Sequence, residues 1–190
     1  MVGGSAGRAG VPADPPARLS VLRQDLDLDR PVRQWLPELL TVRAISTVLF
    51  RLSQACGAQA PMLGYVVKQV NHILTGADLA WQASVGPGFT LYHPTGVVLG
   101  PDVVVGANCV VQQGVTLGAV RERGRMADGR MDSPVVGDGV TLGAGSRILG
   151  PISVGDASVV GANAVVVANV PPGHLAVGVP ARVTPRRTDR

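Results

Sequence analysis

A six-residue count runs through much of this chain and constrains its fold more than any other feature. Between residues 85 and 171 an aliphatic residue stands first in each block, a small or acidic residue second, and a small or β-branched residue fifth. Three uninterrupted blocks cover 99–116 and six cover 136–171, while two blocks at 85–96 precede a two-residue slip. Neither a 3.6-residue helix nor a plain alternating strand has this period.

The period fits a strand followed by a corner, repeated three times in each coil of a parallel β-helix. We expect the first residue of each block to fill the interior. The fifth residue has to be small because it points into a narrow prism, and Cys109, Ser146 and Ala164 meet this condition. A valine-rich β-sandwich is the alternative, but its strands need turn signals about every eight to twelve residues. The sequence therefore predicts a mainly β fold built as a parallel β-helix.

The composition agrees with a solenoid, because aromatic residues make up 3% of the chain and glycine numbers 25. A globular core relies on large aromatic side chains, whereas a solenoid stacks small aliphatic ones in layers. Cys56 and Cys109 have neither metal-ligand spacing nor a disulfide framework, and the scattered histidines predict no metal site. No signal peptide and no apolar run of membrane-spanning length is visible, so we expect a cytoplasmic protein.

The formal net charge is +4 and the isoelectric point about 9.8. Arginines gather at 121–130 and at 182–190. A nucleic-acid partner needs a broad basic face or aromatic stacking platforms, and neither is visible. We therefore expect no nucleic-acid and no membrane partner. A small polyanion, such as the phosphates of a coenzyme, fits a few arginines better.

Four parts follow one another along the chain. They are a disordered Gly-, Ala- and Pro-rich tail, an α-helical region, a β-helix domain interrupted by a polar loop, and a C-terminal tail, at residues 1–17, 18–77, 78–176 (loop 119–134) and 177–190. Ser20 is a candidate N-cap of the first helix, and glycines end the later helices. We expect the chain to leave the prism after Pro171. Six apolar side chains of the helical region should be buried against each other or against another subunit: Leu39, Leu40, Ile45, Val48, Leu49 and Leu52.

Histidine is the usual general base near neutral pH, which makes three residues candidates. His72 lies in a helical segment and His174 in an exposed turn, so we interpret both as structural or surface residues. His93 interrupts a block at a position where a solenoid accepts almost any residue. Asp78 lies just under one coil earlier, so stacking could bring its carboxylate to the imidazole, where it would fix the tautomer. A structural corner histidine remains the alternative from the residues alone.

Several phrases of the chain resemble the serine acetyltransferases, which are hexapeptide-repeat acyltransferases with a left-handed β-helix. They are HPTGVVLG at 93–100, QGVTLG at 113–118, GAGSRILG at 143–150 and GVPAR at 178–182. The resemblance covers about residues 20–185. It implies a left-handed parallel β-helix after a small α-helical N-terminal region, with acetyl-CoA as co-substrate and no metal. It also implies a homotrimer that holds CoA between neighbouring prisms, and it leaves open whether trimers pair into a hexamer.

The resemblance also implies roles for individual residues. By its place in the family's H-x-T-G-V-V-x-G phrase, His93 is the general base, and Asp78 of the G-x-D phrase is its partner. His93 would remove the proton of an acceptor hydroxyl, whose oxygen attacks the thioester directly, while backbone N–H groups stabilise the oxyanion. The implied CoA-binding residues are three small ones that admit the pantetheine arm and two arginines that meet the phosphates: Gly118, Ala144, Ala162, Arg182 and Arg186.

The acceptor site departs from the family pattern. Tyr92 stands where the family has an aspartate before the catalytic histidine, and Asp132 and Ser133 stand where an Arg-His pair holds serine. A family substrate aspartate matches Asp29, or else Asp25 or Asp27. A site built to hold charged groups binds them poorly once their partners are gone. The sequence therefore predicts a divergent acceptor site.

Three functions remain open. The first is an acetyl-CoA-dependent O-acetyltransferase that acts on serine or a serine-like small molecule. The second keeps the fold but acylates a sugar, a capsule unit or a specialised metabolite on oxygen or nitrogen, which Tyr92 and the altered loop favour. The third is a non-catalytic trimeric scaffold. Family members bind the next enzyme of cysteine synthesis through a C-terminal tail that ends in isoleucine, and this chain ends in RRTDR, so we expect no such contact.

Overall fold

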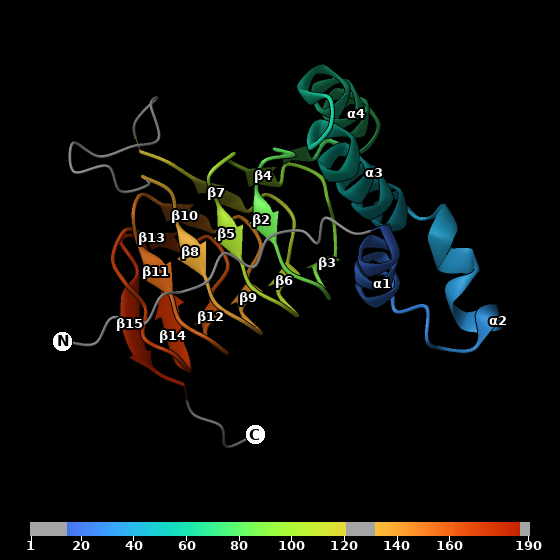
Figure 1. The fold of residues 1–190 in the computed structure, drawn as a ribbon. Coiled ribbons are helices and arrows are strands. Elements are labelled where there is room, and N and C mark those ends of the chain that lie inside the picture. Colours follow the sequence, from blue (N-terminus) through green and yellow to red (C-terminus); the bar gives the residue numbers. More distant parts are fainter. Residues whose placement is uncertain (1–14, 121–131, 187–190) are drawn as a thin grey trace.

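The computed structural model of the protein describes residues 15–120 and 132–186. In these residues the chain forms a three-sided prism with helices at one end (Figure 1). Most of the tail expected at 1–17 and of the loop expected at 119–134 lies outside the described residues, although Pro15 and the next two residues belong to the first helix.

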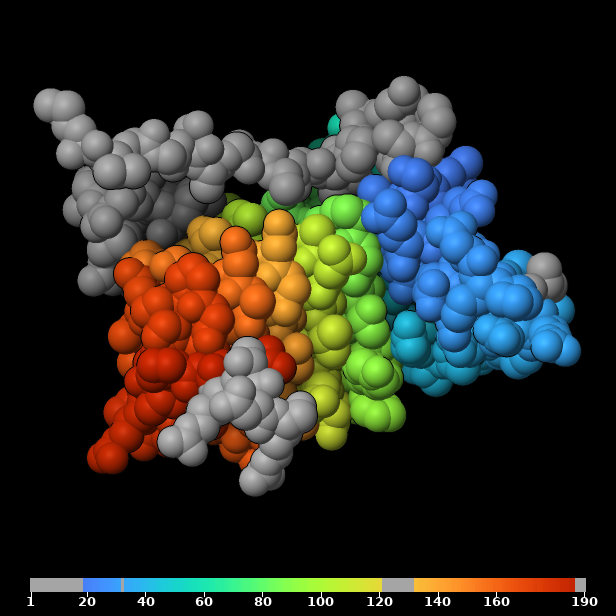
Figure 2. All heavy atoms as spheres, turned by 90° about the horizontal axis from the view of Figure 1, so that it is seen from below, coloured from blue at the N-terminus to red at the C-terminus, as the bar shows by residue number. Residues whose placement is uncertain are grey.

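Three sheets form the sides of the prism, and their strands are parallel except for β15 at the end of sheet C. Sheet A holds β1 (Asp78–Leu79), β4 (Val98–Leu99), β7 (Thr116–Gly118), β10 (Arg147–Leu149) and β13 (Val165–Val166). Sheet B holds β2 (Ser84–Val85), β5 (Val104–Val105), β8 (Val135–Val136) and β11 (Ser153–Val154). Sheet C holds β3 (Thr90–Leu91), β6 (Val110–Val111), β9 (Thr141–Leu142), β12 (Val159–Val160), β14 (His174–Val177) and β15 (Arg182–Pro185). Figure 2 shows the coils as stacked layers beside the helices.

The interior of the prism follows the six-residue count. First residues of the blocks, such as Leu99, Val105 and Val111, are at most 1% exposed, and fifth residues such as Cys109 and Ala164 are fully buried. Each coil therefore adds a layer of small aliphatic side chains to one continuous core. The predicted fold, a left-handed parallel β-helix preceded by helices, is confirmed.

The helical region has five short elements: α1 (Pro15–Asp25), α2 (Val32–Trp35), the 3₁₀ helix η1 (Pro37–Leu40), α3 (Val42–Gly57) and α4 (Pro61–Thr75). The hydroxyl of Thr41 caps α3 by accepting a hydrogen bond of 3.3 Å from the N–H of Ala44. Gly76 ends α4 in the left-handed conformation, with φ of 75°. Ser20 was expected to cap the first helix but lies inside α1, because the helix already begins at Pro15.

The buried side of helix α3 carries polar residues, and its exposed side carries apolar ones. Its buried residues include Thr47, Arg51 and Gln54, whereas Ile45 and Leu52 are exposed. Of the six apolar side chains expected to be covered, none is fully buried in the single chain. The prediction that these side chains bury one another is therefore wrong for the single chain. Their burial against another subunit stays a prediction.

The C-terminal segment adds a further rung to the prism. Instead of leaving after Pro171, the chain continues sheet C with β14, which pairs with β12 and buries Ala176. Strand β15 then folds back and pairs antiparallel with β14. The expectation that the chain leaves the prism after Pro171 is therefore wrong, because β14 and β15 extend sheet C. We propose that the helical and β-helical parts divide at residue 78, because α4 ends at Thr75 and β1 begins at Asp78.

Candidate active site

One corner of the prism is longer than those stacked on it. Six residues separate β3 from β4, whereas four separate β6 from β7, β9 from β10 and β12 from β13. The two extra residues are the slip visible in the sequence, and they lie in the corner that carries His93. The N–H of Gly96 donates to the carbonyl of Gly76, so the coil below supports the end of this corner. His93 is exposed here, directly after Tyr92.

The predicted partner of His93 makes a different contact. Asp78 begins β1, beside Val98 of β4, and its carboxylate forms an ion pair with the ammonium of Lys68 on α4. Among the described residues no hydrogen bond joins Asp78 to His93. A pocket of about 270 Å³ lies around this ion pair, and Trp81 lines it as well. The structure thus places Asp78 and His93 in neighbouring coils without joining them.

The predicted CoA-binding residues lie partly along one edge. Ala144 and Ala162 lie in the corners between sheets C and A, and these corners stack on the one that carries His93. The carbonyl of Ala144 accepts the N–H of Asn163, and its own N–H donates to the side-chain oxygen of Gln112. This edge therefore presents small side chains in successive coils, which leaves room for a ligand close to the backbone.

The remaining predicted CoA-binding residues are more scattered. Gly118 ends β7, and a Cβ placed there would meet nothing within 4 Å. Arg182 begins β15 and lies opposite Val177. Arg186 lies beyond the other end of β15, where its N–H donates to the carbonyl of Gly173. The structure therefore separates the two arginines instead of bringing them together.

The four predicted acceptor residues do not form one cluster. Tyr92 is exposed and lies under the guanidinium of Arg43, whose Cζ is 5.8 Å from the ring centroid. Asp132 and Ser133 are buried just before β8, at another corner of the prism, and Asp132 Oδ2 has no hydrogen-bond partner among the described residues. Asp29 is exposed and forms an ion pair of 2.8 Å with Arg23.

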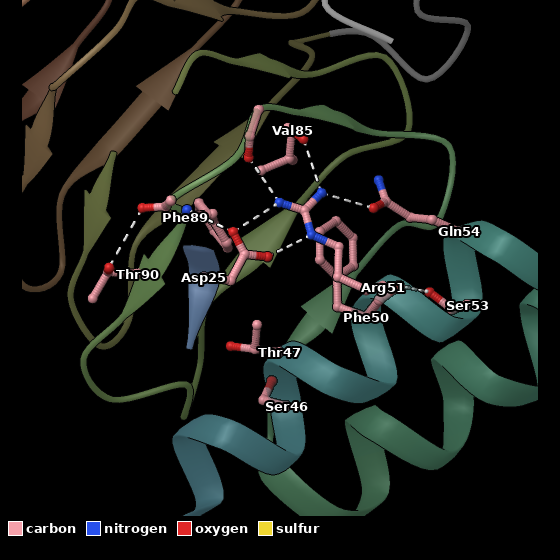
Figure 3. A network of polar contacts seen from close by, with 12 residues as sticks. Asp25, Ser46, Thr47, Phe50, Arg51, Ser53, Gln54, Val85, Phe89 and Thr90 are labelled. Atoms are coloured by element: carbon pink, nitrogen blue, oxygen red, sulfur yellow. Dashed lines mark hydrogen bonds and ion pairs between the residues drawn. The ribbon is translucent and has the colours of Figure 1, made fainter. Parts of the chain in front are cut away.

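Sequence reasoning missed a buried ion pair that joins the helices to the first coil (Figure 3). Arg51 on α3 donates to both carboxylate oxygens of Asp25 at 2.7 and 3.3 Å, and to the carbonyls of Val85 and Gly86. Asp25 also accepts the N–H of Phe89 at 2.9 Å. Burial raises the pKa of Asp25, and the Arg51 guanidinium and the Phe89 N–H oppose this rise.

One signal in the sequence could have revealed this pair. Thr47, Arg51 and Gln54 recur at helical spacing, which marks a polar stripe on a helix whose other side is apolar. Such a stripe normally faces water. Here it faces the backbone carbonyls at the open end of the prism, which need donors.

Two classes of feature are missing from the described parts of the chain. No helix there is long and apolar enough to cross a membrane. No group of three or more His, Cys, Asp or Glu side chains gathers there in a way that could hold a metal ion.

The fold and the long histidine corner define a hexapeptide-repeat protein of the left-handed β-helix class. Residues 133–168 match the bacterial transferase hexapeptide family, and residues 95–119 match the hexapeptide repeat of succinyl-transferase. The serine acetyltransferase of Bacillus subtilis is 31% identical over 170 residues, which cover 86% of this chain and 76% of that protein. This chain therefore belongs to the serine acetyltransferase family.

Other relatives agree on the family. The serine acetyltransferase of Mycobacterium tuberculosis is 43% identical over 124 residues, or 65% of this chain. The crystal structure of the Neisseria gonorrhoeae enzyme superposes with a TM-score of 0.80 at 31% identity, covering 92% of this chain and 67% of that one. A serine acetyltransferase solved in complex with CoA gives a TM-score of 0.77 at 29% identity, covering 90% of this chain and 71% of that one. The chain spans about half of the M. tuberculosis protein, at 52% of its length.

Proposed function

We propose that this protein is an acetyl-CoA-dependent O-acetyltransferase that acts on serine or a serine-like small molecule. One observation carries the proposal beyond family membership: a two-residue insertion exposes His93 on the same edge of the prism as Ala144 and Ala162. A base and a backbone-lined track for a thin ligand thus share one edge. A family member solved with CoA supports the donor, and one solved with serine supports the acceptor.

In the proposed reaction the neutral imidazole of His93 accepts the proton of the acceptor hydroxyl as its oxygen attacks the thioester carbonyl. The tetrahedral intermediate then expels the CoA thiolate, which takes the proton from the imidazolium, and no acyl-enzyme forms. Asp78 would hold the second ring nitrogen of His93 and stabilise the imidazolium. In the free chain Lys68 pairs with Oδ1 of Asp78, so His93 would donate to the other carboxylate oxygen, Oδ2.

The acceptor is the divergent part of the proposal. Tyr92 is exposed beside His93, while Asp132 and Ser133 are buried at another corner. This separation favours a rewritten acceptor site, so a sugar, a capsule unit or a specialised metabolite is the second candidate acceptor. In either case we propose that Gly118, Ala144 and Ala162 border the pantetheine arm and that Arg182 meets a phosphate. Arg186 would meet a phosphate at a different place on the surface, because it lies beyond the other end of β15 from Arg182.

We further propose that the protein is a cytoplasmic homotrimer with CoA between neighbouring prisms. The apolar side chains that α3 leaves exposed, such as Ile45, Val48 and Leu52, support an assembly, because clusters of this kind are usually covered in monomers.

The function is tested by identifying the acetylated product. Purified protein is incubated with acetyl-CoA and with L-serine, homoserine or glucosamine, and the products are analysed by mass spectrometry beside CoA binding by calorimetry. O-Acetylserine as the main product supports the first candidate, and an acetylated amino sugar supports the second. CoA binding without any product, or no CoA binding, contradicts the proposed enzyme and favours a scaffold.

A further inference from the structure

A polar cleft of about 440 Å³ lies where the helical region meets sheet C, next to the His93 corner. Tyr92, the residue directly before His93 in the chain, forms part of its wall, so the cleft extends to the start of the corner that carries the proposed base. The groups that line it come from the helices and the first two coils, and the charged ones are Asp25, Asp27, Arg30, Glu38 and Arg43.

The carboxylates that line this cleft all have cationic partners. Asp25 pairs with Arg51 at 2.7 Å. Asp27 and Glu38 share the guanidinium of Arg30, at 2.7 and 3.1 Å. Arg43 is the other cationic residue that lines the cleft, and none of these three carboxylates is bonded to it.

Arg43 has no ion pair with any described residue. Its guanidinium instead makes a cation–π contact with the ring of Tyr92. The aromatic face holds the guanidinium in place at 5.8 Å but leaves its N–H groups free for an acceptor. Arg43 is half-buried, which reduces the screening of its charge by water. A guanidinium that is positioned and unneutralised in a cleft is a ready partner for a carboxylate.

We propose that Arg43 binds a carboxylate group of the acceptor and thereby determines its specificity. This inference rests on the proposed function and deepens it: the acceptor is a small hydroxylated carboxylic acid held between Arg43 and Tyr92. A single carboxylate suits the cleft better than a phosphate dianion, because among the described residues Arg43 is the one lining cation outside these ion pairs and would balance only one negative charge. No residue with this role was identified from the sequence, in which Arg43 is one arginine among many on the helices.

The test compares three acceptors that differ in one group each. L-Serine and L-serinamide differ in the carboxylate, and L-glycerate keeps the carboxylate but replaces the ammonium by a hydroxyl group. KM is measured for each acceptor and for acetyl-CoA, with wild type, Arg43→Gln and Arg43→Lys. Arg33→Gln is the matched control, because Arg33 is exposed on α2 and does not line the cleft.

We expect wild type to bind serine and glycerate more tightly than serinamide. Arg43→Gln should raise KM for both carboxylates by about 10-fold or more, the usual effect of losing one charged hydrogen bond. KM for serinamide and for acetyl-CoA should stay unchanged, Arg43→Lys should restore part of the loss, and Arg33→Gln should behave as wild type.

Equal KM values for serine and serinamide, or an unchanged KM in Arg43→Gln, would overturn the role of Arg43 while the acetyltransferase function stands. Loss of CoA binding and of turnover with all acceptors would count against the function itself. If CoA binds but no acceptor turns over, binding of serine and glycerate is measured by calorimetry. Binding that Arg43→Gln weakens supports the inference, and no binding of either anion overturns it.

Discussion

At the scale of single residues, the Asp25–Arg51 pair is the contact on which the helical region most depends. Both side chains are almost inaccessible to water, and Arg51 also donates to the side-chain oxygen of Gln54 and to the carbonyls of Val85 and Gly86. Removing one partner of such a pair leaves a buried charge without compensation, which costs far more than losing a surface ion pair.

Arg51→Met should therefore lower the free energy of unfolding by about 3–5 kcal/mol. Arg33→Met changes an exposed arginine and should have an effect of about 0.5 kcal/mol or less. Urea unfolding at one fixed protein concentration measures both variants. A loss in Arg51→Met as small as that in Arg33→Met would mean that the helices are held to the prism by other contacts.

The two cysteines should differ in reactivity. Burial raises the pKa of the Cys109 thiol to about 11, while Cys56 is partly exposed. Alkylation with iodoacetamide at pH 8, followed by mass spectrometry, should modify Cys56 first and spare Cys109 until the protein unfolds. Equal rates for the two cysteines would contradict the burial of Cys109.

The same shift predicts a pH dependence of stability. The unfolded thiol titrates near 9.0 and the folded one near 11, so the folded state holds its proton more tightly between these values. This contribution to stability is complete below pH 9 and is lost as pH rises through 11. Cys109→Ala should remove that part of the alkaline loss, which urea unfolding at several pH values measures.

At the scale of elements, α3 and α4 approach each other through two glycines. A Cβ on Gly64 would lie 2.6 Å from the Cα of Gly57, and a Cβ on Gly57 would lie 2.4 Å from the ring of Trp81. Backbone cannot yield at the first contact as a flexible side chain could. The two helices therefore pack closely because Gly64 lacks a side chain, and Gly57 in turn leaves room for the ring of Trp81.

Gly64→Ala should destabilise the protein by about 1–3 kcal/mol, the usual cost of overpacking. Alanine favours a helix over glycine by about 1 kcal/mol, so the observed sign shows which effect is larger. Gly118→Ala is the control for stability, since a Cβ there meets nothing within 4 Å, but it should weaken acetyl-CoA binding if Gly118 borders the pantetheine arm. A more stable Gly64→Ala variant would contradict the close packing.

The elements differ in how well the sequence predicted them. The six-residue count specified the strands because each block needs one apolar residue inward, and Leu99, Val105 and Ile148 are buried as expected. The count also located the slip that became the His93 corner. It could not reveal contacts between distant elements, such as Lys68 with Asp78 or Arg43 with Tyr92, because these depend on how the helices sit on the prism.

At the scale of the whole molecule, the single chain exposes an apolar surface on its helices. Side chains of α3 and α4 such as Leu52, Met62 and Ile73 are 46, 75 and 73% exposed. A monomer rarely exposes so many large apolar side chains on adjacent elements. The sequence indicated that such residues exist, but only the folded chain shows that they stay uncovered.

The proposed homotrimer should have about three times the 19.5 kDa mass of the chain. Sedimentation equilibrium over a range of concentrations measures this mass, and a paired trimer would give twice that value. A monomer at all concentrations would contradict both the proposed trimer and a CoA site between neighbouring prisms.

The central claim is that His93 is the base of an acetyl transfer, and the most direct test compares kcat of wild type with His93→Ala at saturating acetyl-CoA. His174→Ala is the control, because that histidine lies in sheet C with Nδ1 2.8 Å from the carbonyl oxygen of Pro172. We predict that His93→Ala binds CoA as wild type does but loses about 10²–10⁴-fold in kcat, while His174→Ala keeps its activity. A His93→Ala enzyme with undiminished kcat would contradict the proposed mechanism.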